Sequence, residues 1–210
     1  MAGLAGYKGD LYVGAQTSTT FTNEAMSEPL ADNLLFQVTN AAKSMWDDTA
    51  VTTVQRDQGT GTWIAATAGT YEIDYAIGRV RFLTALGASE AVRVSGKYFT
   101  KTKVAGAKEW SLDIERSIED DTEFGSAWET GVAVLGKGAG SVKLNWQNAA
   151  WMTQIASTTP RLVLALYTDY ANNRRYEFGA LLTKDSVGAS VKGLLEEDLA
   201  FQSTGRIFYT

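Results

Sequence analysis

The chain has 210 residues, of which 45% are hydrophobic and 20% charged, a composition typical of a globular protein and not of a disordered tail. It contains neither cysteine nor histidine, which excludes disulfides, a thiolate nucleophile and Cys-bound zinc, and removes the usual general base of serine and cysteine hydrolases. The formal net charge is -5 without a long Lys/Arg run, so no basic face for gripping DNA is expected.

Segments that would direct the chain to a membrane are not predicted. The opening residues 1–6 have no charged region followed by an apolar stretch, so they do not read as a signal peptide. The longest apolar run, Leu162 to Tyr167, is far shorter than a transmembrane helix. We therefore expect synthesis and folding in a cytoplasm and no membrane segment.

The first half of the chain shows mainly the two-residue period of strands. Residues 39–48 are predicted to form a short helix capped by Thr39, and the Gly- and Thr-rich residues 58–62 a loop. Residues 71–82 alternate apolar and charged side chains around a glycine-containing turn at 76–78, which predicts a hairpin. Another strand is expected from Val92 through Tyr98.

Two longer alternating segments, 110–115 and 141–146, are predicted to pair with one face packed and one face wet. The apolar members, assigned to the core, are Trp110, Leu112, Ile114, Val142, Leu144 and Trp146. The polar members, assigned to the wet face, are Ser111, Asp113, Glu115, Lys143 and Asn145.

The segment that connects these strands, 116–140, is much longer than an ordinary hairpin loop of about 2–5 residues. Its glycine-rich end, 136–140, precedes a strand and not a helix, so we interpret it as a flexible return and not as a phosphate-binding loop. We predict that the segment contacts a neighbouring subunit. The contact residues expected from its acids, aromatics and lysine are Glu119, Asp120, Asp121, Phe124, Trp128 and Lys137.

The C-terminal part predicts one helix and three strands. The helix covers residues 148–157 and is stopped by Pro160. Two strands, 162–169 and 174–184, follow around a turn at 170–173, and a last strand lies within 191–202. The whole chain, 1–210, is therefore predicted as a single mainly β domain: a β-sandwich or partial barrel with one short flanking helix and a long extended hairpin loop. One interpretation of residues 28–104 is that they form an elaboration inserted between its first and second core strands.

The main candidates for a metal-binding or catalytic site are clusters of acids at 47–48, 119–121 and 196–198. Adjacent acids on a strand point in opposite directions, so they rarely converge on a cation or across a glycosidic bond. We expect no catalytic residue, no cofactor and no metal.

Charge is distributed unevenly along the chain. Residues 113–129 contain seven acids and one base, whereas residues 79–103 contain six bases and one acid. Opposite charges at two places on one chain favour head-to-tail association of copies.

Four segments resemble the major tail tube proteins of long-tailed phages and phage-like particles. Gly6–Val13 resembles the first strand of that family, and Lys108–Ile114 its tryptophan-bearing strand. Residues 122–128 and 138–146 resemble the long loop of the family and its returning strand, and residues 193–205 resemble the closing strand. Residues 71–82 also look like a hairpin of some phage virion proteins.

The resemblance implies a structural subunit without enzymatic activity. Copies of the family's proteins form rings, typically hexameric, that stack into a tube, with strands joined around the lumen and long loops bridging to the next ring. For this chain it implies a virion tail location after assembly in the host cytoplasm. Its partners would be itself, other tail proteins and DNA passing non-specifically through the lumen, which the wet-face residues would line. Residues 28–104 depart from the smallest family members.

Three other functions are compatible with the sequence. The chain could be another virion component, such as a head-decoration or tail-terminator protein. It could be a carbohydrate-binding β-sandwich that uses exposed tryptophans and acids. The least favoured is a hydrolase that works with carboxylates alone.

Overall fold

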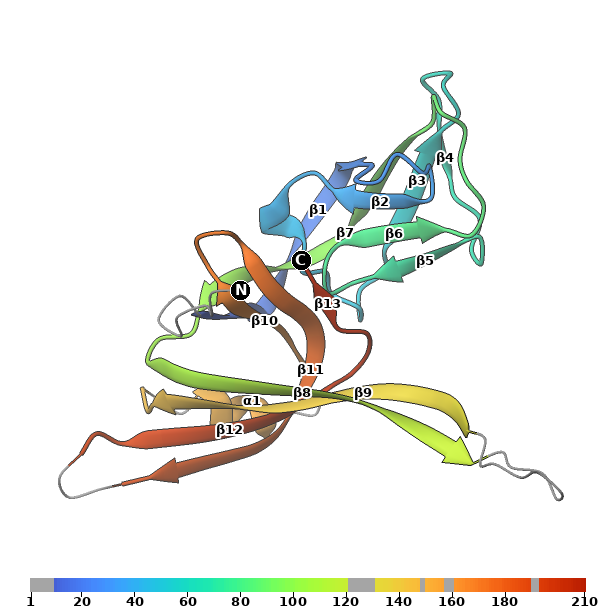
Figure 1. Cartoon of the computed structure of the whole chain (residues 1–210). Coiled ribbons are helices and arrows are strands. Elements are labelled where there is room, and N and C mark those ends of the chain that lie inside the picture. The colour runs from blue at the N-terminus through green and yellow to red at the C-terminus, as the bar shows by residue number, and fades with distance from the viewer. Residues whose placement is uncertain (1–9, 121–130, 148–149, 157–160, 190–192) are drawn as a thin grey trace, which may run out of the picture. The chain divides into compact units, whose positions relative to one another are not determined.

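The computed structural model describes residues 10–120, 131–147, 150–156, 161–189 and 193–210 (Figure 1). The fold is mainly β, as predicted, with one short α-helix and one short 3-10 helix among the described residues. The chain divides into two compact units: an N-terminal unit, residues 12–103, and a C-terminal unit, residues 1–11 with 104–210. The predicted elaboration 28–104 falls almost wholly within the N-terminal unit, and its role as an insertion stays a prediction.

The N-terminal unit is built from antiparallel strands in the order β4-β3-β7-β1-β2-β6-β5. The predicted hairpin at 71–82 is confirmed, since Asp74 pairs with Arg79 and Tyr71 with Phe82. Gly78 makes its turn possible, because it takes a φ of 64° that disfavours a side chain. The strands are β1 (Asp10–Ser27), β2 (Leu35–Val38), β3 (Thr53–Asp57), β4 (Trp63–Ala65), β5 (Tyr71–Asp74), β6 (Arg79–Phe82) and β7 (Ala91–Lys103).

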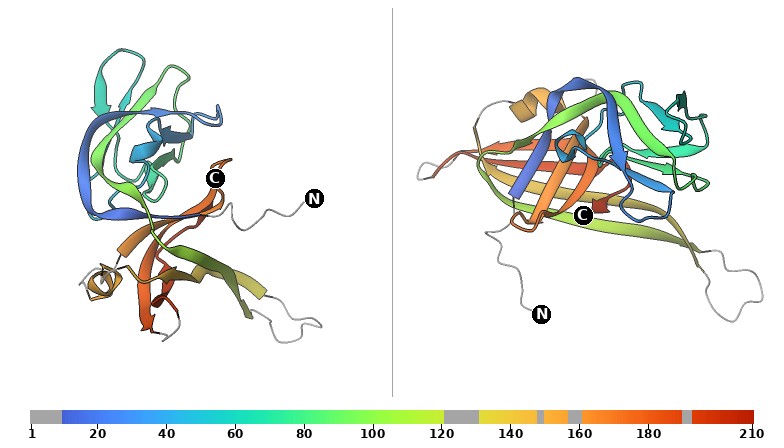
Figure 2. Two further views of the ribbon diagram at one scale, coloured as in Figure 1. Left: turned by 90° about the vertical axis from the view of Figure 1, so that its left-hand side faces the viewer. Right: turned by 90° about the horizontal axis from the view of Figure 1, so that it is seen from above.

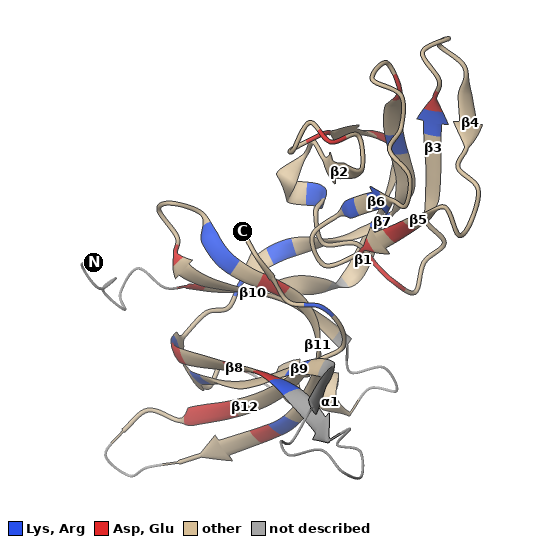
Figure 3. Cartoon of the chain, turned by 45° about the vertical axis from the view of Figure 1, so that its right-hand side comes forward, with Lys and Arg blue, Asp and Glu red and all other residues tan. Residues whose placement is uncertain are grey.

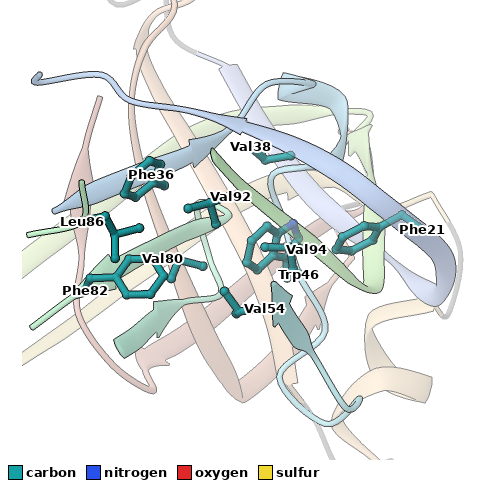
Figure 4. Close-up of a cluster of buried hydrophobic side chains, with 10 residues drawn as sticks. All are labelled: Phe21, Phe36, Val38, Trp46, Val54, Val80, Phe82, Leu86, Val92 and Val94. Atoms are coloured by element: carbon teal, nitrogen blue, oxygen red, sulfur yellow. The ribbon is translucent and has the colours of Figure 1, made fainter. Parts of the chain in front are cut away.

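One apolar cluster holds this unit together (Figure 4). Trp46 lies in it with 1% of its surface exposed, and its indole Nε1 donates a hydrogen bond to the Lys43 carbonyl at 2.7 Å. Burying each large side chain of this kind contributes about 1.5–3 kcal/mol to folding. The members of the cluster are Phe21, Phe36, Val38, Trp46, Val54, Val80, Phe82, Leu86, Val92 and Val94.

The helix predicted at 39–48 is largely wrong. The structure has only a 3-10 helix, Ala41–Lys43, whose cap is Asn40 and not Thr39, because the Asn40 side chain accepts a hydrogen bond from the Ala42 amide at 3.1 Å. Beyond it Trp46 forms an isolated bridge with Tyr98. Tertiary packing of the indole therefore decides the conformation of this segment, against a weak local helix preference.

The C-terminal unit is one antiparallel sheet in the order β10-β11-β12-β9-β8, and β13 pairs with the start of β11. Phe178 and Phe201 pack across its neighbouring strands with ring centroids 5.7 Å apart. The elements are β8 (Ala107–Asp120), β9 (Gly131–Asn145), α1 (Ala150–Ile155), β10 (Arg161–Asp169), β11 (Arg174–Gly188), β12 (Glu196–Ser203) and β13 (Phe208–Tyr209).

The strands and turn predicted in this unit are confirmed at β10 and β11. Asn173 closes the turn at 170–173 with a φ of 56°, and its amide donates to the Tyr170 carbonyl at 3.1 Å. The apolar run Leu162–Tyr167 is buried at every position, so β10 is covered on both faces. The predicted helix 148–157 is present as the shorter α1, and the strand predicted within 191–202 is present as β12, which ends one residue later, at Ser203.

The long segment 116–140 is not a loop over most of its length. β8 continues to Asp120 and β9 starts at Gly131, with Arg116 opposite Gly136. Gly140 serves close packing, because a Cβ there would lie 2.6 Å from the Phe201 ring and clash with the Ser111 carbonyl. The fold therefore has a long β hairpin where the sequence suggested a long loop.

Candidate assembly surface

One face of the C-terminal sheet carries matched polar pairs across β8 and β9. Lys143 lies 3.5 Å from Glu109, and Lys137 lies 3.2 Å from Glu115. Between them the hydroxyls of Ser111 and its cross-strand partner are 3.0 Å apart. Exposed pairs like these add about 0–1 kcal/mol each, so they shape the charge of the face more than they stabilise it.

The predicted wet-face residues come together on this face. Ser111, Asp113, Glu115 and Lys143 are exposed. Asn145 is half-buried, and its side-chain oxygen has no hydrogen-bond partner among the residues that the structure describes. Their role in lining a lumen stays a prediction.

The neighbouring strand β12 extends the same face with more acid (Figure 3). Its alternation directs Glu196 and Asp198 outward. The Lys108 ammonium is 2.8 Å from the Glu196 carboxylate and holds the pKa of that carboxyl below its usual value. The face therefore carries both positive and negative side chains. Because Asp113 and Asp198 add to the paired charges, its net charge is slightly negative.

The opposite, apolar face is only partly closed. Val142 and Leu144 are buried as predicted, and Trp110 and Leu112 are half-buried. The core prediction is wrong for two residues, because 58% of Ile114 and 38% of Trp146 are exposed in the single chain. Ile114 lies opposite Gly138, which offers no side chain to cover it, and Trp146 follows the last residue of β9.

The hairpin of β8 and β9 leaves backbone groups open. Within the described part of the chain, β8 pairs with β9 alone, so its outer edge has no strand partner. β9 pairs with β12 only from Ala139 onward, so residues 131–138 have β8 as their single strand neighbour. Both views of Figure 2 show the two strands continuing side by side as a ribbon. We call this ribbon, residues 114–120 and 131–138, the arm.

The predicted contact residues fall on the arm or beyond it. Glu119 and Asp120 lie in β8, where their backbones pair with Val132 and Gly131. Lys137 lies in β9 and forms the ion pair with Glu115. The remaining three, Asp121, Phe124 and Trp128, are outside the described residues.

Sequence reasoning missed a buried carboxylate on the apolar face. The alternation of β12 turns Glu197 inward between Glu196 and Asp198, opposite Leu144 on one side and Val187 on the other. Only 1% of Glu197 is exposed. It lines a pocket of about 430 Å³ together with Trp146, Met152, Asp185, Val187 and Leu195. The sequence does carry a signal for it: Glu197 stands at an inward-facing position of an alternating strand, where an apolar residue is expected.

Burial, and next the adjoining Asp185 carboxylate, raise the pKa of Glu197 to about 7 from its usual 4.5. Between these values the folded chain keeps a proton that the unfolded chain has released. The free energy of unfolding should therefore fall as the pH rises through this window. Urea unfolding at a series of pH values measures the slope, and Glu197→Gln should remove most of it. An unchanged slope in that variant would contradict the assignment.

The described parts of the chain contain neither a cluster of metal ligands nor a membrane-spanning helix. No group of three or more acidic side chains there is placed to hold a metal ion. No helix in the same parts is both long and apolar enough to cross a bilayer.

Comparison with known proteins identifies solved structures of tailed particles. No family model matches the chain, and no curated protein matches it. The tail of an empty gene transfer agent particle, refined with C6 symmetry, is similar with a TM-score of 0.44 and 16% identity over 53% of this chain and 87% of that chain. The virion of a native gene transfer agent gives 0.42 and 15% over 52% and 88%.

Proposed function

We propose that the chain is a structural subunit of a virion tail, which assembles with its own copies into stacked rings, hexameric by the family resemblance, that form the tail tube. The observation that carries the proposal is the long β8–β9 hairpin with its open outer edge. An exposed strand edge invites pairing with another chain. In a ring, the edge of each copy is satisfied by the next copy.

The polar face of the same sheet suits the wall of a channel for DNA. Its lysines are matched by glutamates, as in the pairs of Lys137 with Glu115 and Lys143 with Glu109. Unmatched cations would bind phosphates and hold the DNA through counterion release. A mixed and slightly acidic wall lets DNA pass without binding it.

The arm suits contact with an adjacent ring. A two-stranded ribbon is marginally stable by itself and gains stability when a partner covers it. Ile114, with 58% of its surface exposed on the arm, supplies apolar area for such a contact. The acids of 113–129 and the bases of 79–103 favour head-to-tail stacking.

Imaging of the purified protein tests the proposal. Negative-stain electron microscopy, with light scattering over a range of concentrations, should show long hollow cylinders built from this chain alone. Closed rings that never elongate would favour a tail-terminator role. A compact monomer at high concentration that binds glycans would favour the carbohydrate-binding alternative and contradict assembly.

A further inference from the structure

The pocket beside Glu197 carries two acids that nothing in the described chain neutralises. Neither oxygen of the Glu197 carboxylate has a hydrogen-bond partner, and the same holds for one oxygen of Asp185, among the residues described. No ion pair within those residues involves either acid. Burying carboxylates in this way is unfavourable unless they take up a proton, as the raised pKa of Glu197 indicates, or a cation joins them.

The walls of the pocket limit what the cation can be. Trp146, Met152, Val187 and Leu195 are apolar, and between 38% and 59% of each is exposed at the surface. Two carboxylates surrounded by such walls provide too few oxygens for calcium, which takes about 6–8. A lysine or arginine side chain fits better, because its apolar stem covers the walls while its charged end reaches the acids. The Trp146 ring adds a surface that attracts cations.

We propose that this pocket receives a basic side chain from a second copy of the chain, supplied by its basic stretch 79–103; this rests on the proposed assembly. Within that stretch, Arg81 is exposed and is followed two residues later by Leu83, which is 60% exposed. Leu83 follows the last residue of β6, so the chain offers a cation and an apolar side chain two residues apart at the end of this strand. Arg81 is the occupant that this chemistry selects, with Leu83 on the apolar rim.

Neutralising the pocket acids in the full chain tests the contact. Asp185→Asn with Glu197→Gln should raise the protein concentration needed for assembly roughly tenfold or more, because it removes both partners of the cation. The matched control, Glu196→Gln with Asp198→Asn, removes the same charge from the outward side of the same sheet and should change that concentration less than about twofold. Glu197→Gln also relieves an unfavourable buried charge at neutral pH, so lost assembly would not reflect unfolding.

Cross-linking identifies the occupant, since the chain has no cysteine of its own. A mixture of the Met152→Cys and Leu83→Cys variants should form disulfide-linked dimers under mild oxidation. A mixture of Met152→Cys with Val51→Cys, a site that is more exposed than Leu83 at 89%, should not. Equal cross-linking in both mixtures would overturn this inference and leave the proposed function standing. The same holds if the Asp185→Asn, Glu197→Gln variant assembles as fully as a wild type that forms tubes. A wild type that never assembles would instead overturn the proposed function.

Discussion

Removing the outer part of the arm is expected to give a folded protein that no longer assembles. The cut should be symmetric, because Arg116 lies opposite Gly136: deleting 117–135 and joining these residues by Asn-Gly preserves the pairing of the remaining strands. The wet face, the apolar face and the pocket all lie outside the deletion. We expect circular dichroism and cooperative unfolding close to wild type, and no cylinders in electron micrographs.

A second variant tests whether the arm contributes to assembly through its charges. The double substitution Glu115→Lys with Lys137→Glu keeps the cross-strand ion pair and the length of the arm. It only changes which of the two strands carries the acid and which the base. Assembly should survive the exchange if the arm acts mainly through its backbone and apolar surface. Tubes formed by the truncated chain would show that the arm is not the contact between rings.

The limits of the sequence-based prediction are clear at this hairpin. Alternation correctly predicted that the strands containing Trp110 and Val142 pair with each other, and the structure supplies their register. It ended the strands too early, because the glycines at 136–140 are typical of loops. Gly140 lies where Phe201 and the β8 backbone leave no room for a side chain, a long-range constraint that the local sequence does not show.

The same limit applies to the pocket. Alternation alone places Glu197 inward, and the prediction that neighbouring acids diverge is confirmed for Glu196 and Glu197. What could not be predicted is the nearness of Asp185, because it depends on a register shift between Leu182 and Lys184. A bulge of this kind moves all later residues of a strand relative to their partners.

The C-terminal unit also contains a charge pair that is satisfied within one chain. Arg175 and Glu177 on β11 are 7% and 1% exposed, and their charged atoms are 3.0 Å apart. The guanidinium donates to the Asn173 carbonyl at 3.0 Å and lies over the Tyr167 ring, 5.4 Å from its centroid. The desolvation cost of both charges is therefore offset by their mutual attraction and by added hydrogen bonds.

Breaking this pair should be among the most destabilising single changes in the chain. Glu177→Ala leaves the Arg175 charge buried without its partner, which costs about 3–5 kcal/mol in the free energy of unfolding, measured with urea. The exposed pair provides the matched control, since Glu115→Ala should cost about 0–1 kcal/mol. Replacing both charges, with Arg175→Met and Glu177→Leu, should recover most of the loss, because no charge then remains buried. A double variant as unstable as Glu177→Ala would show that the pair is held by its shape and packing, and that its charges contribute little.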